Sequence, residues 1–164
     1  MGHNISAIIL QGKYDESTSA EFDLKGIDLG FNLTLFHINH YFSAYWQAKL
    51  GITELLDING VEYALYPCEL TLSELMSIIS NDQETIYSII LTDYFGGIGQ
   101  QYANVYKKQT IADNGISTIN QALSFMGVKR KNGKDEFDSV GLPAHRSEPE
   151  YLEKYCDLAD KLGV

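Results

Sequence analysis

The chain has 164 residues, of which 45% are hydrophobic and 21% charged, and its formal net charge is −10 at pH 7. This composition is typical of a folded protein, and the length fits a single domain over residues 1–164. The acidic balance disfavours a nucleic-acid partner, because phosphate contacts require clustered lysine and arginine. The one basic cluster, at 129–134, is followed at once by acids that nearly cancel its charge.

No apolar run approaches the roughly 18 residues that cross a bilayer, and the first residues lack the features of a secretory signal. Gly2 with Ser6 matches the short myristoylation pattern, but no basic patch adjoins it and one acyl chain holds a membrane only weakly. Cys68 and Cys156 form no Cys-x-x-Cys pair, which is typical of reduced thiols in a cytosolic protein. We therefore expect a cytoplasmic protein with no membrane partner.

The first third of the chain predicts two strands and one longer helix. A strand is expected over Ile5–Gln11, which is apolar and β-branched, and another over Phe31–Phe36, where apolar and polar residues alternate. The next segment, Ile38–Leu50, has apolar residues at helical spacing. Asn39 is a suitable N-cap for this helix, and Gly51 is suited to end it.

The middle of the chain predicts a hairpin. Thr85–Leu91 is a run typical of a central strand, and Tyr102–Ile111 is the second candidate strand. We expect the two to pair across the loop between them. Before this hairpin, Val61–Tyr66 predicts a further strand, and Thr71–Glu74 has the spacing of a capping box that opens a helix.

The last third predicts helices separated by a loop. Ser117–Met126 has an apolar face at helical spacing, and Lys129–Arg146 is expected to be loop-like. Ser147–Glu150 has capping-box spacing, which predicts a final helix that ends at Gly163. Together these elements predict an α+β fold, with a mainly antiparallel sheet of about four to five strands packed against about four helices.

The segment Leu91–Gln101 concentrates three glycines, two glutamines, an acid and two aromatic residues directly after a strand. Glycines in this arrangement favour a sharp turn or close approach by another molecule. The pattern matches neither Gly-x-Gly-x-x-Gly nor a P-loop, which disfavours phosphate binding here. A hairpin turn and a recognition loop stay open. The residues expected to contact a protein partner are Asp93, Tyr94, Phe95, Gly96, Gly97, Gln100, Gln101 and Tyr102.

His37 and His40 are three residues apart, a spacing that on a helix brings two imidazoles together. No further ligands lie near them in the sequence and no His-Glu-x-x-His pattern appears, so we expect no metal site and no cofactor. An enzymatic alternative is a small hydrolase or transferase, with a pocket formed by His37, His40, Asp93 and Cys68.

The segment Thr92–Gln101 resembles a loop of small cytosolic bacterial immunity proteins of toxin–immunity systems, or of an uncharacterised bacterial family. This resemblance implies a non-enzymatic inhibitor that binds and masks a toxin, and it implies no particular interface residue. An acidic surface is compatible with a basic partner that is met through electrostatic steering. We therefore expect a protein-binding module rather than an enzyme. A homo-oligomeric structural module stays open.

Overall fold

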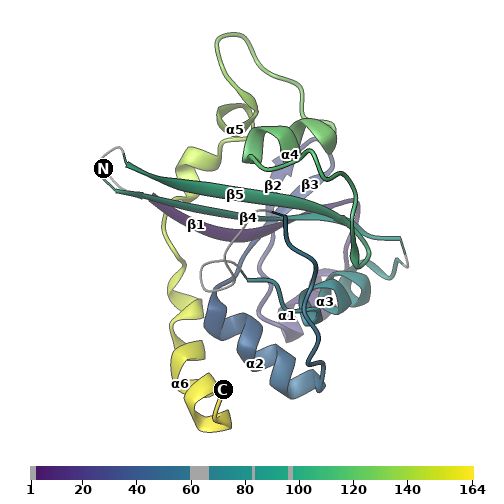
Figure 1. Ribbon diagram of the computed structural model, residues 1–164, viewed down its shortest axis with the longest axis vertical. Coiled ribbons are helices and arrows are strands. Elements are labelled where there is room, and N and C mark those ends of the chain that lie inside the picture. The colour runs from purple at the N-terminus through teal and green to yellow at the C-terminus, as the bar shows by residue number, and fades with distance from the viewer. Residues whose placement is uncertain (1–2, 60–66, 83, 96–97) are drawn as a thin grey trace.

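The computed structural model describes residues 3–59, 67–82, 84–95 and 98–164 (Figure 1). A six-stranded antiparallel sheet with the order β2-β3-β1-β4-β5-β6 lies at its centre. The strands are β1 (His3–Gln11), β2 (Ile27–Gly30), β3 (Leu33–His37), β4 (Ile86–Phe95), β5 (Ile98–Lys107) and β6 (Thr110–Ile111). The helices are α1 (Glu16–Glu21), α2 (His40–Leu50), α3 (Thr71–Ser80), α4 (Ile119–Phe125), α5 (Glu136–Ser139) and α6 (Lys154–Leu162), with 3-10 turns η2 (Leu142–His145) and η3 (Glu150–Leu152).

Helices cover both faces of the sheet, which gives three layers (Figure 1). One face packs against α2, α3 and α6 and is called the α2 face here. The other packs against α4, α5 and the chain around η2 and is called the α4 face. Each face has its own apolar cluster, so the sheet separates two cores.

Strand β1 shows why both faces are covered. Ile5, Ala7 and Ile9 belong to the cluster of the α4 face, whereas Ile8 and Leu10 belong to that of the α2 face. All five side chains are buried. A strand with one solvated face would alternate apolar and polar residues, and this nearly continuous apolar run instead requires a partner layer on each side.

The expected α+β class with a mainly antiparallel sheet is confirmed, as is the hairpin between β4 and β5. The structure has more elements than expected, because β2, β6, α1 and α5 are too short to give a clear periodic pattern. The expected loop Lys129–Arg146 contains α5 and η2. The expected strand Val61–Tyr66 lies outside the described residues.

The expected strand Phe31–Phe36 begins two residues late, at Leu33. Phe31 and Asn32 have φ angles of 55° and 62°, because they form the tight turn between β2 and β3. Turns of this kind require positive φ, which a strand residue does not adopt. No helix in the described part of the chain is long and apolar enough to cross a membrane.

The caps of α2 are those that the sequence predicts. Asn39 Oδ1 accepts a hydrogen bond from Phe42 N at 2.7 Å, and Gly51 ends the helix with φ 68°. The two expected capping boxes are wrong. Thr71 is already inside α3, whose N-cap is Leu70, and the chain beyond Ser147 is extended at Pro149 before it enters η3.

The capping box that does form opens α4. Thr118 Oγ1 accepts a hydrogen bond from Gln121 N at 3.2 Å, and the Gln121 side chain accepts one from Thr118 N at 3.1 Å. A capping residue must have extended backbone angles and the following residues helical ones. The tertiary fold supplies that change of conformation at Thr118 but not at the two other matching segments.

We expect Thr118→Ala to lower the free energy of unfolding by about 1 kcal/mol, because it leaves the first turn of α4 without its side-chain acceptor. Ser147→Ala is the matched control. This exposed serine matches the spacing but caps no helix, so its loss should cost less than about 0.5 kcal/mol. Urea unfolding followed by circular dichroism measures both variants. Equal losses would contradict the assignment of the caps.

Candidate functional site

Strand alternation divides the residues of the β4–β5 hairpin between the two faces of the sheet. Asp93 is paired with Gln100, and Leu91 with Tyr102. Leu91 and Tyr102 belong to the cluster of the α2 face, and residues two apart on a strand share a face. Asp93 and Gln100 therefore lie on the α2 face. There the hydroxyl of Tyr102 donates to Gln100 Oε1 at 2.6 Å.

The pairing of β4 with β5 explains why Gly99 is a glycine. A Cβ atom at Gly99 would clash with the backbone carbonyl of Asp93 on the neighbouring strand. The two strands approach each other so closely that only glycine fits there. For Gly99, this agrees with the hairpin alternative for the glycine-rich segment. Gly96 and Gly97 lie outside the described residues, as does the side chain of Phe95, so their expected contact with a partner stays a prediction.

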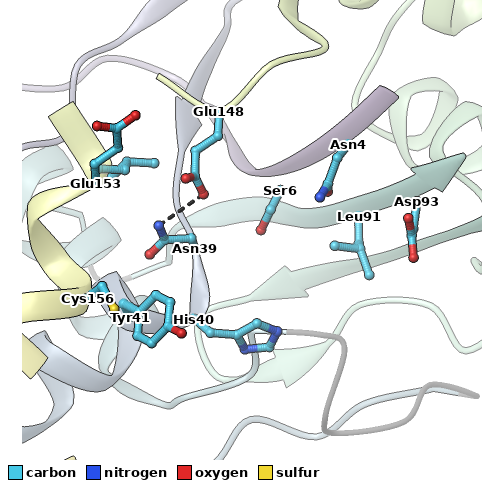
Figure 2. Close-up of a pocket in the computed structure, with 11 residues that line it drawn as sticks. Asn4, Ser6, Asn39, His40, Tyr41, Leu91, Asp93, Glu148, Glu153 and Cys156 are labelled. Carbon is cyan, nitrogen blue, oxygen red and sulfur yellow. Dashed lines mark hydrogen bonds between the residues drawn. The ribbon is translucent and has the colours of Figure 1, made fainter. Parts of the chain in front are cut away.

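A cavity of about 460 Å³ opens on the α2 face beside Asp93 (Figure 2). We call it the acidic cavity. Strands β1 and β4, the start of α2, and the segment that leads into α6 form its walls. It is lined by Asn4, Ser6, Asn39, His40, Tyr41, Leu91, Asp93, Glu148, Leu152, Glu153 and Cys156.

Three carboxylates from distant parts of the sequence line this cavity. Asp93 comes from β4, and Glu148 and Glu153 come from residues 142–153, which we call the C-terminal strap (Figure 2). All three are exposed. Leu91 and Leu152 are buried and line the same space, so the carboxylates lie around an apolar surface.

The strap is fixed against the sheet and α2 by hydrogen bonds. Asn4 N donates to the carbonyl of Arg146 at 3.1 Å, and Asn39 Nδ2 donates to Glu148 Oε1 at 3.0 Å (Figure 2). Because Asn39 also caps α2, one side chain sets both the start of that helix and the orientation of Glu148. Ser6 Oγ is shielded from solvent and has no hydrogen-bond partner among the described residues.

Two ionisable groups near the cavity have shifted pKa values. A hydrogen bond with Cys156 raises the pKa of Tyr41, and the electrostatic interactions with Cys156 and Asp160 act in the same direction. Burial raises the pKa of Glu69, and His40 opposes this shift with its positive charge. Cys156, Asp157 and Asp160 also offer ligand atoms within 4.8 Å of one another, but both acids are exposed and such groups are stable without an ion.

The side chains on the other face serve the fold. Gln101 Oε1 accepts a hydrogen bond from Ile119 N at 3.0 Å, and Gln101 Nε2 donates to the Tyr94 hydroxyl at 3.4 Å. Gln101 and Tyr94 line a smaller cavity of about 180 Å³ together with Asn120 and Asp135. The residues expected to contact a partner therefore lie on opposite faces of the sheet.

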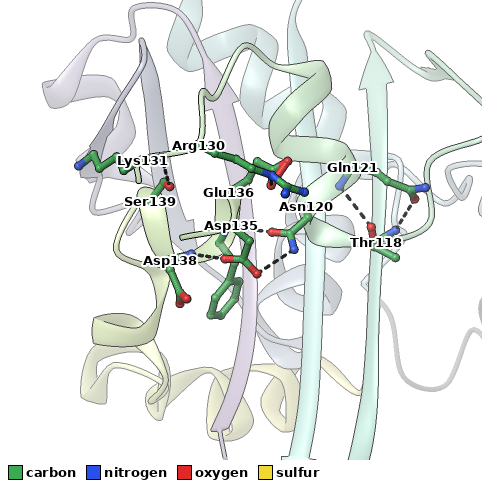
Figure 3. Close-up of polar contacts among 10 residues, drawn as sticks. Thr118, Asn120, Gln121, Arg130, Lys131, Asp135, Glu136, Asp138 and Ser139 are labelled. Carbon is green, nitrogen blue, oxygen red and sulfur yellow. Dashed lines mark hydrogen bonds and ion pairs between the residues drawn. The ribbon is translucent and has the colours of Figure 1, made fainter. Parts of the chain in front are cut away.

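A polar network joins α4 to α5 beside this smaller cavity (Figure 3). Asn120 Nδ2 donates to Asp135 Oδ2 at 3.0 Å, and Asn120 Oδ1 accepts from Phe137 N at 2.8 Å. Arg130 Nε is 2.8 Å from Glu136 Oε2, a carboxylate that is largely buried. These contacts explain why a segment expected to be a loop contains a helix.

The structure does not bring the four alternative catalytic residues together. His40 and Asp93 line the acidic cavity. His37 is paired with Ala7 and lies on the opposite face, where it borders a different cavity. Cys68 is buried in the apolar cluster of the α2 face, and burial raises the pKa of its thiol to about 11.

Several residues of the acidic cavity were not expected from the sequence. Glu148 and Glu153 reach it only because the strap crosses the end of β1, a contact between residues far apart in the chain. Cys156, on the last helix, also lines it. Tyr41, which falls outside the apolar stripe of its helix, is 48% exposed and lines the cavity as well.

Comparison of the chain with family models, with curated proteins and with solved structures found no match. Function is therefore inferred from the geometry and charge of the described residues.

We expect Cys156 to react with iodoacetamide in the folded protein at pH 8 and Cys68 to remain unmodified. Cys156 is half-buried at a cavity wall, whereas Cys68 is buried and only about a thousandth ionised at that pH. Peptide mass spectrometry after timed labelling measures both sites, and unfolding in urea is the control in which both must react. Rapid modification of Cys68 in the folded state would instead indicate a nucleophile with access to solvent.

We expect Gln101→Ala to lower the free energy of unfolding by about 1 kcal/mol, because Ile119 N then loses its acceptor. Gln100→Ala is the matched control on the exposed side of the same strand, and it should change stability by less than about 0.5 kcal/mol. Urea unfolding compares the two. A larger loss for Gln100→Ala would mean that Gln100, and not Gln101, faces α4.

Proposed function

We propose that this protein is a non-enzymatic protein-binding module that receives a basic side chain of a protein partner in the acidic cavity. The observation that carries the proposal is the set of three carboxylates, Asp93, Glu148 and Glu153, around an apolar surface. A lysine or arginine side chain has matching chemistry, since its cationic head follows an apolar stem.

The charge of the lining supports this choice of ligand. Among the described residues that line the cavity, His40 is the sole side chain able to carry a positive charge in the physiological range, and there is no lysine or arginine. The whole chain has a net charge of −10, which attracts basic proteins over distances of about 10 Å at moderate salt. Charge of this kind raises the association rate more than it raises the affinity.

The mode of action we propose is that of an immunity-type inhibitor, which masks a basic toxin or enzyme by covering its surface. Asp93 and Gln100 at the end of the hairpin adjoin the cavity on the α2 face, so they would extend the contact surface. Tyr102 supports Gln100 through its hydroxyl. Tyrosine beside a charged rim is typical of protein interfaces.

The test uses the tagged protein and three variants in a low-salt pull-down from the native host, read by quantitative mass spectrometry. We expect one near-stoichiometric basic protein, whose affinity falls about tenfold in Asp93→Asn and in Glu148→Gln. Both substitutions keep shape, and the glutamine amide oxygen can still accept from Asn39. The association rate with the captured protein should also fall as salt rises.

Asp113→Asn is the matched control, because it removes one carboxylate at the opposite end of β5, beyond β6. Its amide oxygen can keep the hydrogen bond from Gly115 N, so the turn should persist. Equal binding by all three variants would show that the acidic cavity is not the contact site, and binding that is insensitive to salt would contradict a basic partner.

A further inference from the structure

A second cavity lies at the other side of the C-terminal strap, beside the start of β2. Its volume is about 830 Å³, within the range of small-molecule sites. We call it the histidine cavity, because His37 and His145 both line it. Lys25 and Arg146 line it as well, so four basic side chains gather here in a protein whose net charge is strongly negative.

Arg146 has no electrostatic partner among the described residues. It takes part in none of the ion pairs found there, and its Nε is shielded from solvent without a hydrogen-bond acceptor. The backbone around it is fixed, since the Arg146 carbonyl accepts from Asn4 N. A guanidinium donor in this position is costly unless an acceptor binds it, and oxyanions are the acceptors that guanidinium prefers.

His37 has a second polar atom that lacks a hydrogen-bond partner. The side chain is only 4% exposed, and its Nε2 lies 3.3 Å from the carbonyl of His145. A carbonyl can only accept, so Nε2 carries the hydrogen, and Nδ1 of the neutral ring is then a bare acceptor. Nδ1 is shielded from solvent and has no partner among the described residues. Protonation would turn this atom into a donor, which an anion satisfies.

The other charged groups of the cavity define its electrostatics. The ring of His145 lies 6.3 Å from that of His37, and Lys25 Nζ lies 4.5 Å from the centre of the Tyr151 ring. Burial lowers the pKa of His37, and the positive charge of His145 acts in the same direction. The carbonyl of His145 and the carboxylate of Glu148 oppose this shift. Glu150, which is exposed, is the second acid in the lining.

We propose that the histidine cavity binds the oxyanion of a small phosphate- or carboxylate-bearing molecule between Arg146 and His37, and that His37 takes up a proton as the anion binds. Arg146 Nε and His37 Nδ1 are both shielded from solvent in the free protein, so binding requires the two side chains to turn toward the cavity, where Nε and the protonated Nδ1 donate to the anion. Lys25, at the cavity rim, adds attraction for the same charge. The proposal needs no protein partner, although Glu148 lines this cavity as well as the acidic cavity.

Anion binding and protonation of His37 favour each other. In the free protein the lowered pKa of His37 favours the neutral ring, whereas a bound anion raises that pKa. The complex therefore holds one more proton than the free protein between the two pKa values. Affinity is highest below the pKa of the free protein, and it falls as pH rises through this window.

The test is a titration of labelled protein with inorganic phosphate and, separately, with acetate, followed by the NMR resonances of the histidine rings at constant ionic strength. Acetate stays ionised throughout the range in which histidine titrates, so any pH dependence in that arm comes from the protein. Phosphate itself titrates in this range, and the comparison of the two arms identifies which oxyanion the site prefers.

We expect saturation with the preferred anion to raise the pKa of His37. Arg146→Gln should weaken binding about tenfold, because it removes a charge-assisted hydrogen bond. Lys129→Gln removes one exposed positive charge outside the cavity and should leave binding unchanged. His37→Gln is a second variant. It should keep part of the affinity, and its affinity for acetate should change less with pH than that of the unmodified protein.

Equal affinities of Arg146→Gln and Lys129→Gln would overturn the proposal, as would His37 resonances that move with neither anion. Should Arg146→Gln fail to fold, the His37→Gln comparison decides: an unchanged pH dependence of acetate binding rejects the role of His37. Loss of binding to the basic partner leaves this result untouched, so the two proposals fail separately.

Discussion

Side chains of a strand alternate between the faces of its sheet, and here both faces are covered by helices. Side chains that follow one another along β1 or β4 therefore lie on opposite faces of the sheet and do not line the same cavity. Asp93 faces the acidic cavity, whereas Tyr94 supports the hydrogen-bond network at the start of α4. The same separation places His37 and His40 beside different cavities. This constraint explains most of the site geometry.

The C-terminal strap turns this layered fold into a surface with two distinct cavities. It crosses the end of β1, to which it is joined by the hydrogen bond between Asn4 and Arg146. Glu148 lines both cavities, and its orientation is set by Asn39. The acidic cavity combines carboxylates with an apolar surface, whereas the histidine cavity combines basic groups that have unfilled hydrogen-bond capacity. The chemistry of the two sites is therefore opposite, although they are close in the fold.

The sequence predicts the features that depend on local pattern. The continuous apolar run of β1, the periodicity of α2 with its cap at Asn39, and the hairpin across the glycines all follow from neighbouring residues. Asp93 could be selected because it is the acidic residue three positions before the first of those glycines, Gly96. Short elements such as β6 have too few residues for a periodic signal, and the sequence alone does not reveal them.

The remaining features depend on contacts between distant residues. Glu148 reaches the site through the strap, and nothing in its neighbourhood in the sequence indicates a cavity. Capping-box spacing at Thr71 was misleading because the preceding residue is already helical, a conformation that tertiary packing imposes. The hydrogen bond from Ile119 N to Gln101 was not predicted either, because the two residues are 18 positions apart in the chain.

The pairing of β4 with its two neighbours decides which side chains meet in the acidic cavity, and interstrand nuclear Overhauser contacts in labelled protein measure it directly. We expect contacts that pair Asn4 with Asp93 and Asp93 with Gln100, together with contacts between the Leu91 methyl groups and the ring of Tyr102. A slip of one residue would move Asp93 to the α4 face. Contacts between Asp93 and the start of α4 would therefore contradict this account of the site.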